Sequence, residues 1–71
     1  MAGQIITYQA LLTKPASLAQ VEAQRKAITK VGGRVHLHPG NAVGQTSVVL
    51  ELPAPYQPDD FLPGLPFFPI P

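Results

Sequence analysis

The chain's two histidines, His36 and His38, are the residues whose type and spacing come closest to a metal site. Side chains two positions apart on a strand point to the same face, so both imidazoles could reach one metal ion. A closed zinc site takes four ligands, however, and the chain has no cysteine. Glu51 or an acidic residue of the C-terminal segment would have to complete the set. We therefore predict that His36 and His38 are ordinary polar surface and that no cofactor is bound. Metal or ligand binding by this pair, as a small regulator, is an alternative function.

No group of residues has the spacing of a catalytic site. Asp59 and Asp60 are adjacent, so their carboxylates point apart unless a turn reunites them. Ser17 and Ser47 have no neighbouring base that would activate a hydroxyl. The segment 40–44 contains two glycines but precedes a strand, whereas a phosphate-binding loop precedes a helix. A single layer of structure also encloses little concave surface. The sequence therefore predicts a protein that is not an enzyme and has no small-molecule ligand.

Alternation of apolar and polar residues predicts three strands, over residues 4–12, 34–38 and 46–52. The first carries large apolar side chains on both faces, so its ends are expected to be covered on both sides. In the second, Val35 and Leu37 are expected to point to the core. The third is the most apolar of the three.

A helix is predicted over residues 18–31, where apolar side chains recur at helical spacing. Ser17 has the chemistry of an N-cap, and Gln20 stands where a capping box needs it. Glu22 and Lys26 are four residues apart in the favourable order for an ion pair. Two glycines, at positions 32 and 33, are expected to end the helix in a left-handed conformation.

These elements predict an α+β fold, a small βαββ sheet that corresponds to half of a ferredoxin-like fold, with one helix on one face. A right-handed crossover favours placing the apolar third strand between the first and the second. Such a sheet has one face without a helix, and the outer edge of its first strand is unpaired. We expect residues 1–52 to form this module.

Residues 53–71 are expected to be a separate C-terminal arm. They hold seven of the nine prolines, and proline at this density disfavours helix and strand ladder, which predicts an extended arm. Aromatic and aliphatic side chains stud the arm, so it is expected to lie in a groove of this or another chain. Deletion of the arm is then expected to abolish partner binding and to leave a folded domain.

Composition limits the possible partners and location. Charged residues make up 13% of the chain and hydrophobic residues 45%, and all five basic residues lie in the first half. This charge asymmetry suits contacts between proteins, whereas a nucleic-acid binder has a denser basic cluster with stacking aromatics. No stretch reaches the roughly 20 apolar residues of a membrane span, and residues 1–4 have no basic signal-peptide region. A chain this short is expected to need support from a partner or from oligomerisation, and we predict a cytoplasmic location.

The helix-to-strand junction over residues 23–35, AQRKAITKVGGRV, resembles the small linker polypeptides of cyanobacterial phycobilisomes. Those proteins close a helix with a basic and aliphatic run, follow it with Gly-Gly and enter a strand. The match covers under a third of the chain. The same junction is similar to propeptide or inhibitor domains of subtilisin-type proteases, whose C-terminal tails lie in a protease groove. Both resemblances imply a non-catalytic module that works through a docked surface and tail.

The leading prediction is therefore an assembly subunit that docks on a larger complex, or on further copies of itself, through its sheet and its arm. A propeptide-like protease inhibitor is an alternative. Aromatic and arginine side chains carry much of the binding energy of protein interfaces. The predicted contact residues are the arm's apolar side chains and the helix-proximal basic ones, namely Tyr56, Phe61, Leu65, Phe67, Phe68, Arg25, Lys26, Lys30 and Arg34.

Overall fold

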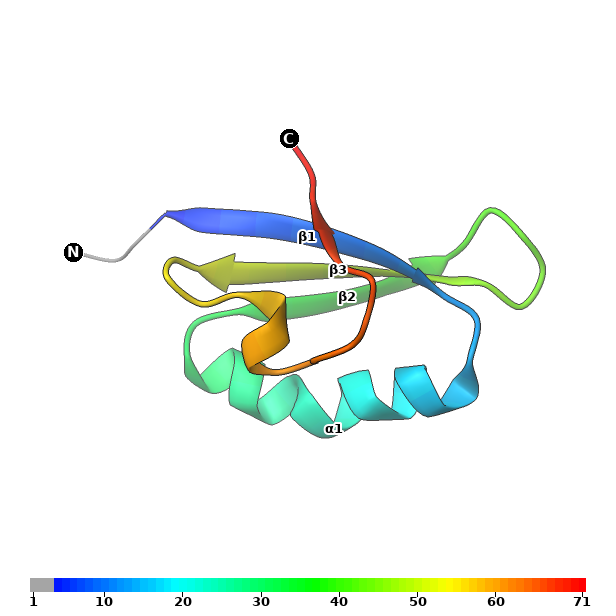
Figure 1. The fold of residues 1–71 in the computed structure, drawn as a ribbon, viewed down its shortest axis with the longest axis horizontal. Helices are drawn as coiled ribbons and strands as arrows, with labels where there is room; N and C mark the ends of the chain where they lie inside the picture. Colours follow the sequence, from blue (N-terminus) through cyan, green and yellow to red (C-terminus); the bar gives the residue numbers. More distant parts are fainter. Residues whose placement is uncertain (1–3) are drawn as a thin grey trace.

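A computed structural model describes residues 4–71, in which one helix packs under a four-stranded antiparallel sheet (Figure 1). Residues 1–3, which include most of the segment considered above for a signal peptide, lie outside the described residues. The elements along the chain are β1 (Ile5–Leu12), α1 (Pro15–Lys30), β2 (Arg34–Pro39), β3 (Thr46–Pro53), the short 3-10 helix η1 (Pro58–Asp60) and β4 (Phe68–Pro69). The predicted α+β class is confirmed. The strand order is β2-β3-β1-β4, so the apolar β3 lies between β1 and β2.

The core lies between the sheet and α1 and is built from alternate strand residues. It consists of Tyr8, Ala10 and Leu12 of β1, Val35 of β2, Val48, Leu50 and Leu52 of β3, Val21 and Ile28 of α1, and Leu62. The register pairs Tyr8 with Leu50 and Ala10 with Val48, which brings the apolar positions of β1 and β3 to the same face. Val35 and Leu37 lie on the helix side of β2, as expected, but only Val35 is buried. The Leu37 side chain is 40% exposed, because β2 is an edge strand whose end extends past the core.

The helix begins earlier than predicted. It starts at Pro15 with Lys14 as the N-cap, and the expected side-chain cap from Ser17 is absent. Proline suits the first helical position because its fixed φ is helical and its missing amide has no partner there. The predicted end is confirmed, since Gly32 has a φ of +92° directly after the C-cap. The predicted Glu22–Lys26 pair is replaced by an ion pair between Glu22 and Arg25.

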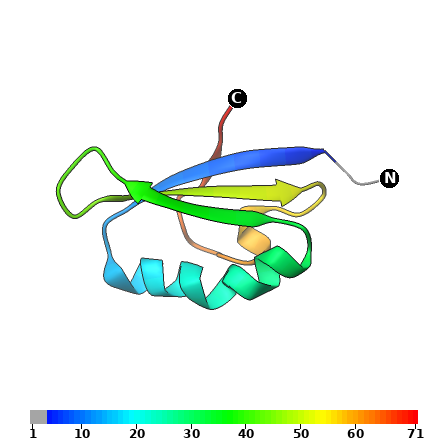
Figure 2. The same cartoon turned by 180° about the vertical axis from the view of Figure 1, so that it is seen from behind.

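Residues 53–71 are not an extended arm in the structure. Pro58 starts η1, Phe68 and Pro69 form β4 on the outer edge of β1, and Leu62 between them is fully buried in the core. Figures 1 and 2 show this segment passing beneath the sheet beside α1 before it rises to β1. The segment therefore covers the helix side of the sheet and closes the β1 edge, and the structure gives no support to the expected independence of residues 1–52.

The prolines of the strands stand where no amide donor is needed, which is why proline density did not prevent a ladder here. Ile70 donates its amide to the Thr7 carbonyl at 2.9 Å, so Thr7 and Gln9 direct their backbone groups toward β4. Pro69, opposite Tyr8, therefore occupies a position that makes no hydrogen bond to β1. An edge strand tolerates proline at such positions.

The face of the sheet that points away from α1 carries no helix or loop in the described residues (Figure 2). The bare face predicted from the sequence is thus present, whereas the predicted open edge of β1 is closed by β4. The two edge strands of the sheet in the described residues are β2 and the short β4.

Candidate protein-binding surface

The uncovered side of the sheet, which we call the open face, displays large apolar side chains. Strand alternation and the pairing register place the following residues on it: Ile5, Thr7, Gln9 and Leu11 of β1, Ser47, Val49 and Glu51 of β3, Arg34, His36 and His38 of β2, and Phe68 of β4. Ile5 is 51% exposed, Leu11 38% and Phe68 48%. Three of the six large apolar side chains that are exposed in the described residues therefore lie on this one sheet face.

The open face has a basic side and an apolar side. The register aligns His36 with Val49 and Val49 with Gln9, and Gln9 in turn lies opposite Phe68. The side chains on β2 are all polar, whereas the exposed large apolar ones lie on β1 and β4, where Thr7 and Gln9 are interspersed with them. A partner that matches this face would place an apolar surface over β1 and β4 and acceptor or acidic groups over β2.

A hydrogen bond fixes the middle of the open face. Gln9 Nε2 donates to Ser47 Oγ at 2.8 Å, which joins neighbouring strands through their side chains. Ser47 is buried beneath this contact, and no buried side-chain polar atom of the described residues lacks a partner. The face is thus a preorganised surface whose central polar groups are satisfied before any partner binds.

The two histidines lie together on the open face, as their spacing predicts. Their rings stack with centroids 6.4 Å apart, and His36 Nε2 lies 3.5 Å from Glu51 Oε1. Over residues 4–71 there is no group of three histidine, cysteine, aspartate or glutamate side chains arranged to hold a metal ion. The pair therefore forms a polar border of the open face.

The predicted basic residues do not form one cluster. Arg25 forms an ion pair with Glu22, with 2.9 Å between Nη2 and Oε1, and it also donates from Nη1 to the Val35 carbonyl at 3.4 Å. The hydrogen bond between them lowers the pKa of Glu22 and raises the pKa of Arg25. Arg34 belongs to the open face, while Lys26 and Lys30 are exposed on α1.

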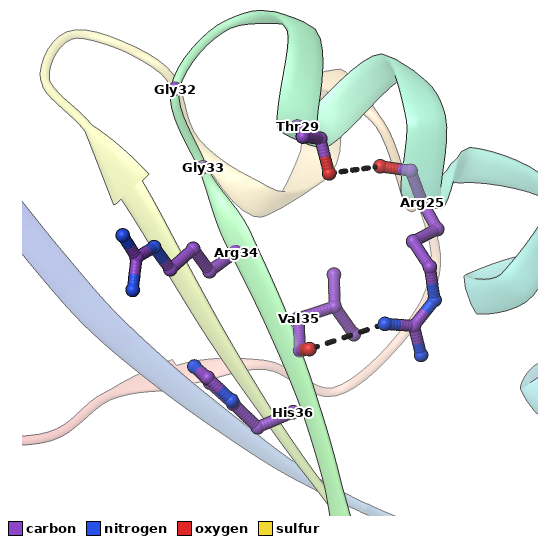
Figure 3. A pocket seen from close by; sticks show the side chains of 7 residues that line it. All are labelled: Arg25, Thr29, Gly32, Gly33, Arg34, Val35 and His36. Atoms are coloured by element: carbon purple, nitrogen blue, oxygen red, sulfur yellow. Dashed lines mark hydrogen bonds between the residues drawn. The ribbon is translucent and has the colours of Figure 1, made fainter.

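An open groove of about 440 Å³ lies between Arg25 and Arg34 at the edge of β2. Figure 3 shows Arg25 reaching β2 from the helix, while Arg34 and His36 extend over the opposite side of the strand. Thr29 Oγ1 donates to the Arg25 carbonyl at 3.0 Å within α1. Because the guanidinium groups of Arg25 and Arg34 diverge, the groove does not focus positive charge on one point.

The predicted aromatic anchors are divided between the core and the surface. Phe61, Leu65 and Phe67 are partly buried against the core, and their apolar surface is used within the chain. Tyr56 is exposed and packs on Phe61 with ring centroids 5.9 Å apart. Of the five predicted anchors, only Phe68 lies on the open face.

The residues that sequence reasoning missed are Ile5, Leu11 and Val49. The signal for Ile5 and Leu11 was present in the first strand, whose second face carries large apolar side chains, whereas Val49 belongs to the third strand. That signal was interpreted as coverage of both faces, because the sequence alone does not show on which side the C-terminal segment packs.

Similarity to known proteins adds no assignment for this surface. No protein-family model matches the chain, and neither curated proteins nor solved structures show a significant match to it. In the described part of the chain, the single helix is too short and too polar to span a membrane.

Proposed function

We propose that this protein is a non-enzymatic interaction module that docks on a larger protein assembly through the open face of its sheet. The observation that carries the proposal is the exposure of Ile5, Leu11 and Phe68 on a face that no other described element covers. Burying these side chains against a partner would release apolar surface from water at about 25 cal/mol per Å². This is the kind of role that the resemblance to assembly linkers implies.

The proposed contact surface differs from the one expected from the sequence. The C-terminal segment contributes Phe68 to the open face, while Phe61, Leu65 and Phe67 stabilise the fold. Arg34 and the two histidines border the apolar side chains and would set the orientation of the partner. We infer a protein partner with an apolar ridge beside acidic side chains.

Site-specific photo-crosslinking tests this proposal in cells that contain the natural partner. A photoreactive phenylalanine analogue at position 11 is expected to trap one protein species, and the same analogue at the fully exposed loop residue Val43 is not. With the trapped protein purified, Leu11→Lys is expected to weaken its binding at least tenfold, since it places a charge in the apolar contact, and Val43→Lys is expected to leave binding unchanged. Equal crosslinking from both positions, or unchanged affinity of Leu11→Lys, would overturn the proposal.

Metal binding by His36 and His38 is the alternative function, and its test is independent of any partner. If Zn²⁺ raises the melting temperature of the wild-type protein and His36→Ala removes the increase, the alternative is supported. No increase in the melting temperature removes it.

A further inference from the structure

Among the described residues, the outer edge of β2 is the sheet edge whose backbone amides can still pair with another strand. The sheet order places β2 and β4 at the two edges. Phe68 of β4 and the following residue, Ile70, direct their backbone groups toward β1, so Pro69 faces outward and supplies no donor. The β4 edge is therefore blocked by its proline, while the β2 edge is not.

The alternation of backbone hydrogen bonds along β2 shows which of its amides and carbonyls point away from β3. Gly40 donates its amide to the Gln45 carbonyl at 2.8 Å, which continues the register that pairs His38 with Ser47. The even-numbered residues of β2 therefore bond to β3, and Val35, Leu37 and Pro39 direct their backbone groups away from it. The contact of Arg25 with the Val35 carbonyl comes from this outer side (Figure 3).

Two of the outward-facing residues of β2 cannot offer both of their backbone groups to another strand. Pro39 has no amide, and the Val35 carbonyl is already bonded to Arg25. The outward groups that remain are the amides of Val35 and Leu37 and the carbonyls of Leu37 and Pro39. Proteins usually cover or block such groups, because an unpaired row of them recruits another strand.

We propose that a second copy of this chain pairs antiparallel along β2, with Leu37 opposite Leu37 of the second copy, to form one continuous sheet. In this register the two Leu37 residues exchange hydrogen bonds, and each Val35 amide donates to the Pro39 carbonyl of the other copy. The Val35 carbonyl then faces the proline that cannot donate to it, and it is the carbonyl that Arg25 satisfies. The amide that Pro39 lacks would therefore have bonded only to the Val35 carbonyl, which already accepts a hydrogen bond from Arg25.

The neighbouring symmetric register, which is centred on His36, fits less well. If Val35 lay opposite Leu37 of the second copy, the Leu37 amide would meet the carbonyl that Arg25 holds. The Pro39 carbonyl would then face Gly33, whose amide already donates to Ile28 at 2.9 Å. Only the Leu37-centred register of these two uses every outward group once.

The side chains agree with the Leu37-centred register. Leu37 is exposed at the edge on the helix side, and pairing places it against its own counterpart. Arg34 lies opposite Gly40 of the second copy, so no basic side chains face each other directly there. His36 lies opposite His38 of the second copy on the open face. The open face itself stays uncovered, which makes this pairing independent of the proposed docking function.

Disulfide trapping tests the register directly, since the chain has no cysteine of its own. Positions 36 and 38 would form a non-hydrogen-bonded pair, whose Cα atoms lie about 4.5 Å apart, within disulfide range. Under mild oxidation, a mixture of His36→Cys and His38→Cys chains is expected to form a crosslinked dimer of one of each. Neither variant alone is expected to crosslink. Crosslinking of His36→Cys with itself, or of His38→Cys with itself, indicates a different register and overturns the proposal, as does no crosslinking at all.

A second variant separates the strand edge from the rest of the molecule. Leu37→Pro removes an amide that the single chain does not use, so the fold measured by circular dichroism is expected to be retained. Its dimer dissociation constant, measured by sedimentation, is expected to rise about thirtyfold, since two hydrogen bonds per dimer are lost. Leu11→Lys is the matched control: it alters a similarly exposed leucine on the open face and is expected to leave the dimer intact while weakening partner docking. A wild-type chain that stays monomeric at all accessible concentrations would refute the pairing without affecting the docking proposal.

Discussion

Pro69 lies directly opposite Tyr8, at a position of the β1–β4 ladder that makes no backbone hydrogen bond. The next residue, Ile70, donates its amide to the Thr7 carbonyl at 2.9 Å. The last residue of β4 therefore needs no backbone amide, whereas the residue directly after it uses its amide to bond to β1. This alternation explains how a proline-rich segment closes a sheet edge.

Substitutions at these two positions are expected to have different effects on stability. Ile70→Pro removes the amide that bonds to Thr7 and is expected to cost about 1–3 kcal/mol in the free energy of unfolding. Pro69→Ala removes no hydrogen bond and is expected to change it by less than about 1 kcal/mol, mainly through the unfolded chain. Urea denaturation followed by circular dichroism measures both. Equal losses would mean that the β4 ladder does not contribute as described.

Leu62 makes the C-terminal segment part of the core, because its side chain is fully buried among residues of β1, β3 and α1. Leu62→Ala is expected to lower the free energy of unfolding by about 2–5 kcal/mol through the cavity that it leaves. Val43→Ala, in an exposed loop, is the control and is expected to stay within about 0.5 kcal/mol of wild type. For the same reason, deletion of residues 53–71 is now expected to unfold the domain, contrary to the sequence-based expectation. A truncated chain with native-like stability would contradict this role of the segment.

Gly33 sits where the end of α1 meets β3, too close for any side chain. A Cβ atom there would lie 2.7 Å from the Glu51 carbonyl oxygen and 2.8 Å from Ile28 Cγ2. Gly33→Ala is therefore expected to destabilise the fold by about 1–3 kcal/mol, as overpacking does. Gly44→Asn is the comparison variant. Gly44 has a φ of +78°, which asparagine tolerates, and a Cβ atom added there would have no neighbour within 4 Å. Thermal melting should show a clear loss for the first variant and little change for the second, and the reverse order would contradict the packing described.

The Glu22–Arg25 pair predicts a specific acid sensitivity. The hydrogen bond from Arg25 lowers the pKa of Glu22 in the folded state below its ordinary value of 4.5. The unfolded chain therefore takes up this proton at a higher pH than the folded chain does, so stability from the pair is present above pH 4.5 and is lost as the pH falls further. The effect is expected to be small, because both side chains are exposed. Urea midpoints of wild type and Glu22→Gln should differ at pH 6 and converge toward pH 3, and a difference that stays constant over this range would contradict the assignment.

Local signals in the sequence predicted the elements that depend on neighbouring residues. The apolar stripe and the glycine pair placed α1 to within a few residues, and alternation placed β1, β2 and β3. Residues 53–71 were different, because their conformation depends on contacts with β1 far away in the chain. Proline content indicates which conformations a segment disfavours. It does not reveal that Pro69 would lie opposite Tyr8, at a position of the ladder that makes no backbone hydrogen bond. The sequence predicted a sheet face without a helix, but it did not predict that Ile5 and Leu11 are exposed there. Their exposure depends on the face of the sheet on which the C-terminal segment packs.

The pairing of β4 with β1 joins residues from opposite ends of the chain, and this has a kinetic consequence. The helix and the β2–β3 hairpin close over short stretches, whereas the β1–β4 contact must close a loop that contains almost the whole domain. Contacts of such high sequence separation slow folding and tend to form late. The prolines of residues 53–71 reduce the number of conformations that the unfolded segment can sample, so less chain entropy is lost when it docks. Their contribution therefore lies in lowering the entropic cost of the last and longest closure in the folding of the domain.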